Sequence, residues 1–146
     1  MEMVRIYEIP DCKMVSSGIG NFGEGKFGRF EQWFVSLPQS IYPQDFLFWD
    51  GEGFHWLWIY TKDLNVPDEF DIIDFKGGLY AVCCGIDQQT DMDTMYKIKR
   101  EFLDKFDYEI DESRSGMGHN VTSTAGNNVL GYNQMDYWTP IKQKSK

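Results

Sequence analysis

The sequence predicts an α+β fold made of a doubled strand-helix-strand-strand unit. One segment alternates aromatic and other residues with the period of a β-strand, and two segments have the apolar spacing of amphipathic helices. The order of these elements also repeats along the chain. Because 146 residues suit one domain, we expect a single domain over residues 1–146, with modules at about 1–66 and 67–142.

The clearest strand is predicted from Phe54 to Thr61, because aromatic residues alternate with other residues along it. Its partner is predicted at Phe46–Trp49. The Asp-Gly-Glu-Gly sequence between them supplies the residues that tight hairpins use where φ is positive. Three further aromatic residues share the side of the strand that carries Phe54, namely Trp56, Trp58 and Tyr60.

The first helix is predicted from an apolar stripe with spacings of three or four residues, formed by Phe27, Phe30, Phe34 and Leu37. It is expected to end before Pro38, because the proline ring disfavours helical backbone in the preceding residue. Such a stripe buries one face of the helix against a sheet.

The second helix is predicted from a similar stripe, formed by Met95, Ile98, Phe102 and Phe106. Thr90-Asp91 precedes it, and these side-chain oxygens can cap free amide groups. The basic residues of this segment are expected to point away from the stripe, namely Lys97, Lys99 and Arg100.

An internal repeat relates the two halves of the chain. The stripe Phe27, Phe30 and Phe34 recurs at a constant offset as Met95, Ile98 and Phe102. At an offset one residue shorter, Ile6, Val15, Gly18 and Ile19 recur as Ile73, Val82, Gly85 and Ile86. A second hairpin, Asn128–Tyr132 with Met135–Ile141, would complete the second copy. The doubled unit implies an approximate two-fold axis.

Composition excludes several functions. A net charge of −9 with scattered basic residues argues against direct nucleic-acid binding. No apolar run is long enough for a membrane helix, and no signal-like segment begins the chain, so we expect a cytoplasmic protein without membrane contact. The cysteines, Cys12, Cys83 and Cys84, lack metal-type spacing. We expect neither a metal nor a cofactor.

Two motifs resemble the GyrI-like domains, also known as effector-binding domains of AraC-type and MerR-type transcriptional regulators. Gly-Gly-Leu-Tyr-Ala-Val at residues 77–82 is similar to the start of a strand in that family. Residues 135–142 resemble its closing strand, where an acidic residue lies four positions before a proline with an aromatic residue between them. The order of elements is similar from Met3 to Lys142. The glycine pair also has a purely structural meaning, a bend that allows close backbone approach.

The resemblance implies an antiparallel sheet with two main helices flanking a cleft. It also implies a stand-alone domain that senses or sequesters an apolar or cationic, effector or drug-like molecule. A regulator or enzyme is a possible partner protein. Carried onto this chain, the acidic residue near the floor of the cleft is Asp136, and the aromatic residue on its strand face is Trp138. The family more often has glutamate, so the shorter Asp136 alternatively points to solvent.

The residues themselves favour the same region. A strand that carries Asp136 and Trp138 on one face places a carboxylate beside an indole. A buried carboxylate needs a partner, and a bound cation can supply the charge while it stacks on an aromatic ring. Four other aromatic residues are candidate walls of the ligand site, although the face of the first three alternatively lies under the helices: Trp56, Trp58, Tyr60 and Tyr80.

Two other functions remain open. Some GyrI-like proteins are hydrolases that open strained rings with a carboxylate and a tyrosine, for which Asp136 with Tyr80 or Tyr137 would be the pair. Another member of the family modulates gyrase through protein contact. The histidines, His55 and His119, lie beside no recognisable nucleophile motif, so we assign no catalytic residue and favour binding over catalysis.

Overall fold

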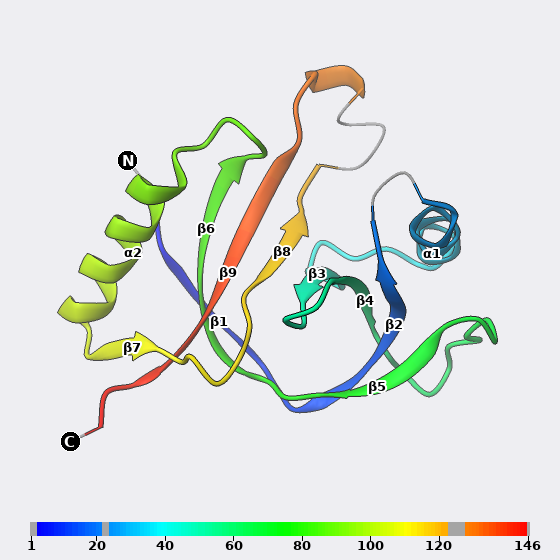
Figure 1. The fold of residues 1–146 in the computed structure, drawn as a ribbon, viewed down its shortest axis with the longest axis horizontal. Coiled ribbons are helices and arrows are strands. Elements are labelled where there is room, and N and C mark those ends of the chain that lie inside the picture. The colour runs from blue at the N-terminus through cyan, green and yellow to red at the C-terminus, as the bar shows by residue number, and fades with distance from the viewer. Residues whose placement is uncertain (1–2, 22–23, 123–127, 146) are drawn as a thin grey trace. The chain divides into compact units, whose positions relative to one another are not determined.

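The computed structural model describes residues 3–21, 24–122 and 128–145. The chain divides into two compact units. The small unit contains residues 11–76, and the large unit contains residues 1–10 and 77–146. Each unit combines one main helix with antiparallel strands (Figure 1). The predicted α+β class is confirmed.

The small unit consists of β2 (Cys12–Gly20), α1 (Gly25–Val35), β3 (Asp45–Trp49), β4 (Phe54–Ile59) and β5 (Asp71–Phe75). Its strands are antiparallel in the order β3-β4-β2-β5. The predicted hairpin is confirmed, since β3 pairs with β4 across a turn in which Gly51 has a φ of 98°. β4 ends at Ile59, before the predicted Thr61.

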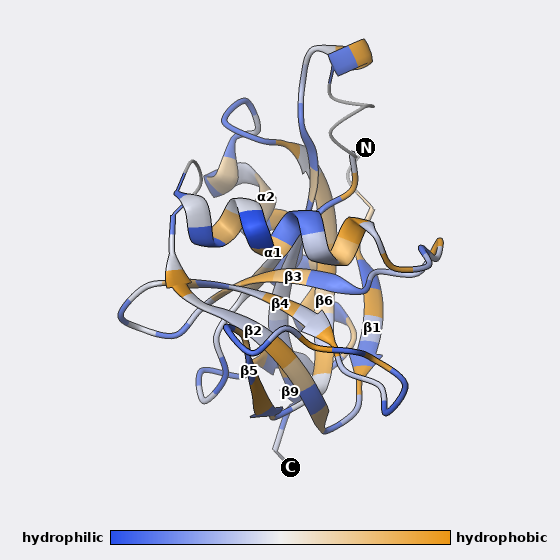
Figure 2. Ribbon diagram, turned by 90° about the vertical axis from the view of Figure 1, so that its right-hand side faces the viewer, coloured by the Kyte–Doolittle hydropathy of each residue, from blue (hydrophilic) through white to orange (hydrophobic). Residues whose placement is uncertain are grey.

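The core of the small unit lies between α1 and its sheet. Phe27, Phe30 and Phe34 are the buried residues of α1, as the helical spacing predicts. The helix ends at Val35, ahead of Pro38, also as predicted. Figure 2 shows hydrophilic and hydrophobic residues in turn along α1, which is the pattern of a helix with one buried face.

The large unit consists of β1 (Arg5–Ile9), β6 (Gly78–Ile86), α2 (Met92–Lys105), β7 (Tyr108–Ile110), β8 (Met117–Asn120) and β9 (Gln134–Gln143). The sheet order is β1-β6-β9-β8, and β7 pairs with the end of β9. The predicted cap of α2 is confirmed, because the Asp91 carboxylate accepts bonds from the backbone N–H groups of Asp93 and Thr94.

Both units repeat one strand order, which confirms the doubled strand-helix-strand-strand arrangement. In each, the strand before the helix pairs with the last strand of the module, as β2 with β4 and β6 with β9. The edge strands β1 and β5 each pair with a strand of the other module in the sequence. β1 precedes β2 in sequence but pairs with β6, whereas β5 precedes β6 and pairs with β2.

The second predicted hairpin is wrong in its first strand. Residues 128–130 are helical, and the partner of β9 is β8 instead. β8 has the sequence Met-Gly-His-Asn, which lacks the β-branched alternation that marks a strand. Val129 and Leu130 supplied the apolar signal for a strand, yet both are exposed.

The buried stripe of α2 also differs from the prediction. Its buried residues are Met95, Lys99 and Leu103, whereas Phe106 is exposed beyond the end of the helix. Lys99, expected to point outward, is 1% exposed. The prediction for Lys99 relied on its charge alone, but a lysine can be buried where its ammonium group finds hydrogen-bond acceptors.

No helix within the described ranges is both long and apolar enough to cross a membrane.

Candidate functional site

The two faces of β9 have different environments. Ile141 faces α2 and packs in a buried cluster with Ala81 and Leu103. Alternation along the strand therefore turns Asp136 and Trp138 to the face opposite α2. The same face receives Tyr80, because β6 pairs with β9 so that Tyr80 lies opposite Pro140.

Asp136 is buried, with 6% of its surface exposed, and so does not point to solvent. Its Oδ2 accepts a hydrogen bond from Arg5 Nη2 of β1 at 3.0 Å. Its Oδ1 is buried and has no hydrogen-bond partner within the part of the chain that the structure describes. Cys84 of β6 and His119 of β8 are its register partners on either side.

Three aromatic rings from three strands lie on the same sheet face as this carboxylate. Tyr7 of β1 stacks on Trp138, with centroids 5.1 Å apart and planes 19° apart. Tyr80 meets Trp138 edge to face at 5.6 Å. The Arg5 guanidinium lies 5.3 Å from the centroid of the Tyr7 ring. We call this group the Asp136 site, made of Arg5, Tyr7, Tyr80, Asp136 and Trp138.

A second arginine, Arg114, contacts the Tyr80 ring of the site. The Arg114 guanidinium lies 4.9 Å from the Tyr80 ring centroid and donates to the backbone oxygens of Leu79 and Ile141. Its Nε donates to Asp111, whose pKa is lowered by hydrogen bonds from Ser113 and Arg114. These bonds hold Arg114 against the ring, and so they fix the position of Tyr80.

The glycine pair has the structural role that sequence analysis left open. A Cβ on Gly77 would lie 1.9 Å from the backbone oxygen of Ile9. Gly78 has a φ of 148°, and a Cβ there would meet the Arg114 guanidinium at 2.6 Å. The two glycines therefore permit the close approach that brings β1 and Arg114 to the site.

Lys99 secures β9 from the helix side. Its Nζ donates to the Tyr137 backbone oxygen and to Thr139 Oγ1, each at 2.8 Å. Burial lowers the pKa of Lys99 to about 8, while nearby Cys83 and Asp136 act in the opposite direction. The ammonium thus links α2 to the strand that carries Asp136 and Trp138.

The structure separates the other predicted site residues from this group. Trp56 and Trp58 are buried in the core of the small unit, where Phe34 stacks on Trp58 at 5.2 Å. Tyr60 packs against the same core. Among the six candidates, the structure brings together Tyr80, Asp136 and Trp138.

His55 belongs to a hydrogen-bonded chain that sequence reasoning missed. Ser16 Oγ lies 2.9 Å from His55 Nδ1, and His55 Nε2 contacts Asp50 Oδ2. Ser16 is 2% exposed and accepts a bond from the Gly18 backbone N–H. These residue types occur in nucleophilic triads, but a nucleophile must be open to substrate. Here the chain ties the β3–β4 turn to β2.

The Asp50 carboxylate completes that turn. The backbone N–H groups of Glu52 and Gly53 donate to it, and together with His55 they lower the pKa of Asp50 to about 2. Only the spatial pairing of β2 with β4 brings Ser16 near His55, and no sequence motif marks it.

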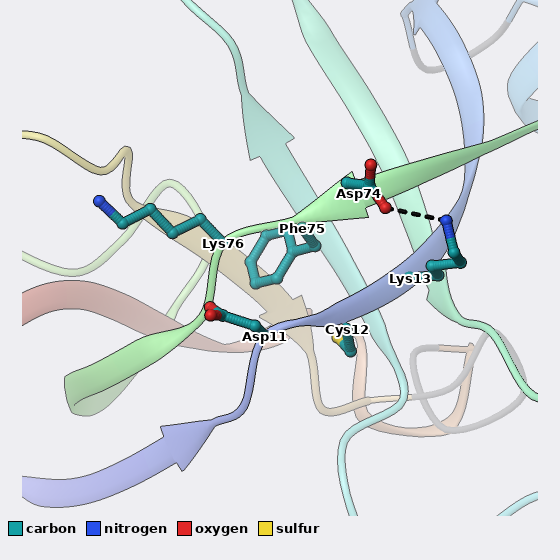
Figure 3. A pocket seen from close by; sticks show the side chains of 6 residues that line it. All are labelled: Asp11, Cys12, Lys13, Asp74, Phe75 and Lys76. Atoms are coloured by element: carbon teal, nitrogen blue, oxygen red, sulfur yellow. Dashed lines mark hydrogen bonds and ion pairs between the residues drawn. The ribbon is translucent and has the colours of Figure 1, made fainter.

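An open pocket of about 620 Å³ lies elsewhere in the small unit, lined by Asp11, Cys12, Lys13, Asp74, Phe75 and Lys76 (Figure 3). Lys13 Nζ bonds to Asp74 Oδ1 at 2.9 Å, and the Asp74 side chain is 91% exposed. Such solvated charges on an open surface bind small molecules weakly. None of the six sequence candidates lines this pocket.

Solved structures share this fold. EcmrR in a DNA complex matches with a TM-score of 0.67 at 9% identity, covering 99% of this chain. The EcmrR C-terminal domain matches with a TM-score of 0.61 at 10% identity, covering 98% of this chain and 99% of that one. This chain therefore has the fold of the EcmrR C-terminal domain.

A hydrolase from Listeria innocua also matches, with a TM-score of 0.63 at 8% identity and coverage of 95% of this chain and 91% of that chain. This chain spans 58% of the EcmrR chain in the DNA complex. No family model matches the sequence, and neither does any curated protein. At these identities the similarity shows the fold alone.

Proposed function

We propose that the protein is a small-molecule-binding domain whose ligand sits on the Asp136 site. The observation that carries the proposal is a buried carboxylate with one unpaired oxygen beside stacked aromatic rings. A buried acceptor without a partner costs about 1–3 kcal/mol, so a ligand that donates to Asp136 Oδ1 recovers this energy.

The ligand class follows from the two components of the site. Tyr80 and Trp138 are buried, and with Tyr7 they would supply the aromatic contacts to a flat apolar group that enters the site. Asp136 adds an acceptor for an N–H group or a positive charge. The ligand is therefore a small planar molecule with a donor or a cation. The resemblance to effector-binding domains supports sensing or sequestration of such a molecule.

Three of the predicted site residues belong to this proposal. Tyr80, Asp136 and Trp138 share one sheet face of the large unit. Trp56, Trp58 and Tyr60 are left out, because their rings form or border the core under α1. Of the two tyrosines considered for hydrolysis, Tyr137 points to the other face of β9, whereas Tyr80 lies in the site. Asp136 is already paired with Arg5, so we favour binding over hydrolysis.

The test is calorimetric titration with a planar aromatic cation, N-methylacridinium, against the wild type and two variants. Asp136→Asn keeps the shape of the side chain and removes its charge. Asp74→Asn makes the same change in the open pocket of the small unit. We expect saturable binding that Asp136→Asn weakens about tenfold or more and Asp74→Asn leaves unchanged.

Two results would contradict the proposal. One is the absence of saturable binding in every form of the protein. The other is equal weakening by both substitutions, because a general loss of negative charge would then explain the effect.

A further inference from the structure

Arg5 occupies the position that the proposed function gives to a cationic ligand. Its guanidinium donates to Asp136 Oδ2 at 3.0 Å and lies 5.3 Å from the Tyr7 ring centroid. A second nitrogen, Nη1, donates to the Tyr7 hydroxyl at 3.1 Å. One side chain thus makes both the ion pair and the cation–π contact that an aromatic cation would make.

We infer that Arg5 is a resident cation that sets the charge selectivity of the Asp136 site, an inference that rests on the proposed function. Arg5 bonds to Asp136 Oδ2, so a cationic ligand that approaches the unpaired Oδ1 must compete with Arg5 for the charge of the same carboxylate. A neutral ligand of the same shape meets no such competition for charge. Arg5 therefore weakens the binding of cations without weakening that of neutral molecules.

The register explains how Arg5 reaches the carboxylate. Arg5 of β1 lies opposite Val82 of β6, and Val82 lies opposite Trp138 of β9. Asp136 is two residues from Trp138 on the same face, so the arginine side chain spans the whole of β6. Two strand spacings amount to about 10 Å between β1 and β9. Of the positively charged side chains, only the long ones of arginine and lysine can reach Asp136 from β1.

The contact can be released without unfolding. The Arg5 side chain is 41% exposed, whereas that of Asp136 is 8% exposed. The half-exposed arginine can reach solvent, where it has many rotamers. Displacement of Arg5 leaves its charge hydrated and opens the buried carboxylate to a ligand. Asp136 keeps its place because β9 is bound to Lys99 and paired on both sides.

The experiment compares two planar probes of the same shape at pH 8, N-methylacridinium as the cation and acridine as the neutral form. Both are titrated into the wild type, Arg5→Gln and Arg5→Lys. The matched control is Arg29→Gln, which removes a similarly exposed arginine paired with Glu69 in the small unit. Circular dichroism establishes that each variant is folded.

We expect Arg5→Gln to bind N-methylacridinium about fivefold to tenfold more tightly than the wild type, and acridine within about twofold. Arg5→Lys keeps the charge and should resemble the wild type, as should Arg29→Gln. In the double variant Arg5→Gln with Asp136→Asn, the gain for the cation should disappear.

Equal or weaker binding of the cation by folded Arg5→Gln would overturn the inference, and weaker binding would make Arg5 a ligand contact. An equal gain for both probes would also overturn it, because Arg5 would then act through its size. If neither probe binds any form, the proposed function itself fails. The two failures are therefore distinguishable.

Discussion

At the scale of single residues, the site depends on a few positions that no other residue can fill. Gly77 is the clearest, since a Cβ there would lie 1.9 Å from the backbone oxygen of Ile9. Backbone cannot move aside as the end of a flexible side chain can. Gly77 therefore determines how closely β1, which carries Arg5 and Tyr7, approaches the start of β6.

We predict that Gly77→Ala destabilises the protein by about 2–4 kcal/mol, because backbone must shift to admit the methyl group. Urea unfolding measures the change. The control is Gly28→Ala in α1, where a Cβ has no neighbour within 4 Å. That substitution should stabilise the helix by about 0.5–1 kcal/mol. Similar stability of the Gly77→Ala variant and the wild type would contradict the packing described here.

Sequence reasoning reached Asp136 and Trp138 but not their partners. Alternation along a strand is enough to place these two residues on one face. Arg5 is 131 residues away from Asp136 in the chain, and their contact depends on the pairing of β1 with β6. Pattern analysis of single segments contains no information on such pairing, so it also missed Tyr7.

At the scale of elements, α2 is held to the sheet by an unusual buried contact. Lys99 lies in the middle of its buried stripe, between Met95 and Leu103. Its two hydrogen bonds to β9 offset part of the cost of burying an ammonium group. The pKa lowered to about 8 shows that the folded state still disfavours the charged form.

This lowered pKa predicts a dependence of stability on pH. The unfolded chain binds more protons at Lys99 than the folded chain between pH 8 and the ordinary lysine value of 10.5. Stability should therefore rise with pH across this window. Relative to Lys99→Met, the wild type should gain about 2–3 kcal/mol between pH 7 and 10.5.

Urea unfolding of both proteins at several pH values measures this gain. The difference between them removes the contributions of other groups that titrate at high pH, such as Tyr137 and Cys84, whose pKa values are raised by burial. A difference that stays constant with pH would contradict the prediction, because it would show that Lys99 has the same pKa in the folded and the unfolded protein.

Element prediction succeeded where a segment carries its own period and failed where tertiary contacts decide. The stripe of α1 and the alternation of β4 were sufficient for those elements. The short β8 has no such period, and it is a strand because β9 pairs with it. Its β-propensity is a property of context rather than of its residues.

At the scale of the whole molecule, the two modules of the repeat exchange their edge strands. β1 and β5 each pair with a strand that does not belong to their own module in sequence. The repeat in the sequence already aligned Ile6 of β1 with Ile73 of β5. It could not show where either strand pairs, because a repeat defines correspondence and not contact.

We predict that deletion of residues 1–9 lowers the melting temperature by about 10 °C or more, because β6 loses its edge partner and the large unit loses residues such as Ile6 that pack against its core. Thermal unfolding followed by circular dichroism measures this shift. Glu8→Ala, an exposed change on the same strand, should have little effect. An unchanged melting temperature after the deletion would contradict the assignment of β1 to the large unit.

The central claim is that a ligand binds against Trp138 in the large unit. The most direct measurement is a nitrogen–proton spectrum of the tryptophan indole groups during titration with N-methylacridinium, with the Trp138 signal assigned from Trp138→Phe. We predict that the Trp138 signal shifts saturably while those of Trp56 and Trp58 stay in place. A constant Trp138 signal with shifts at Trp56 or Trp58 would contradict the claim and move the ligand to the small unit.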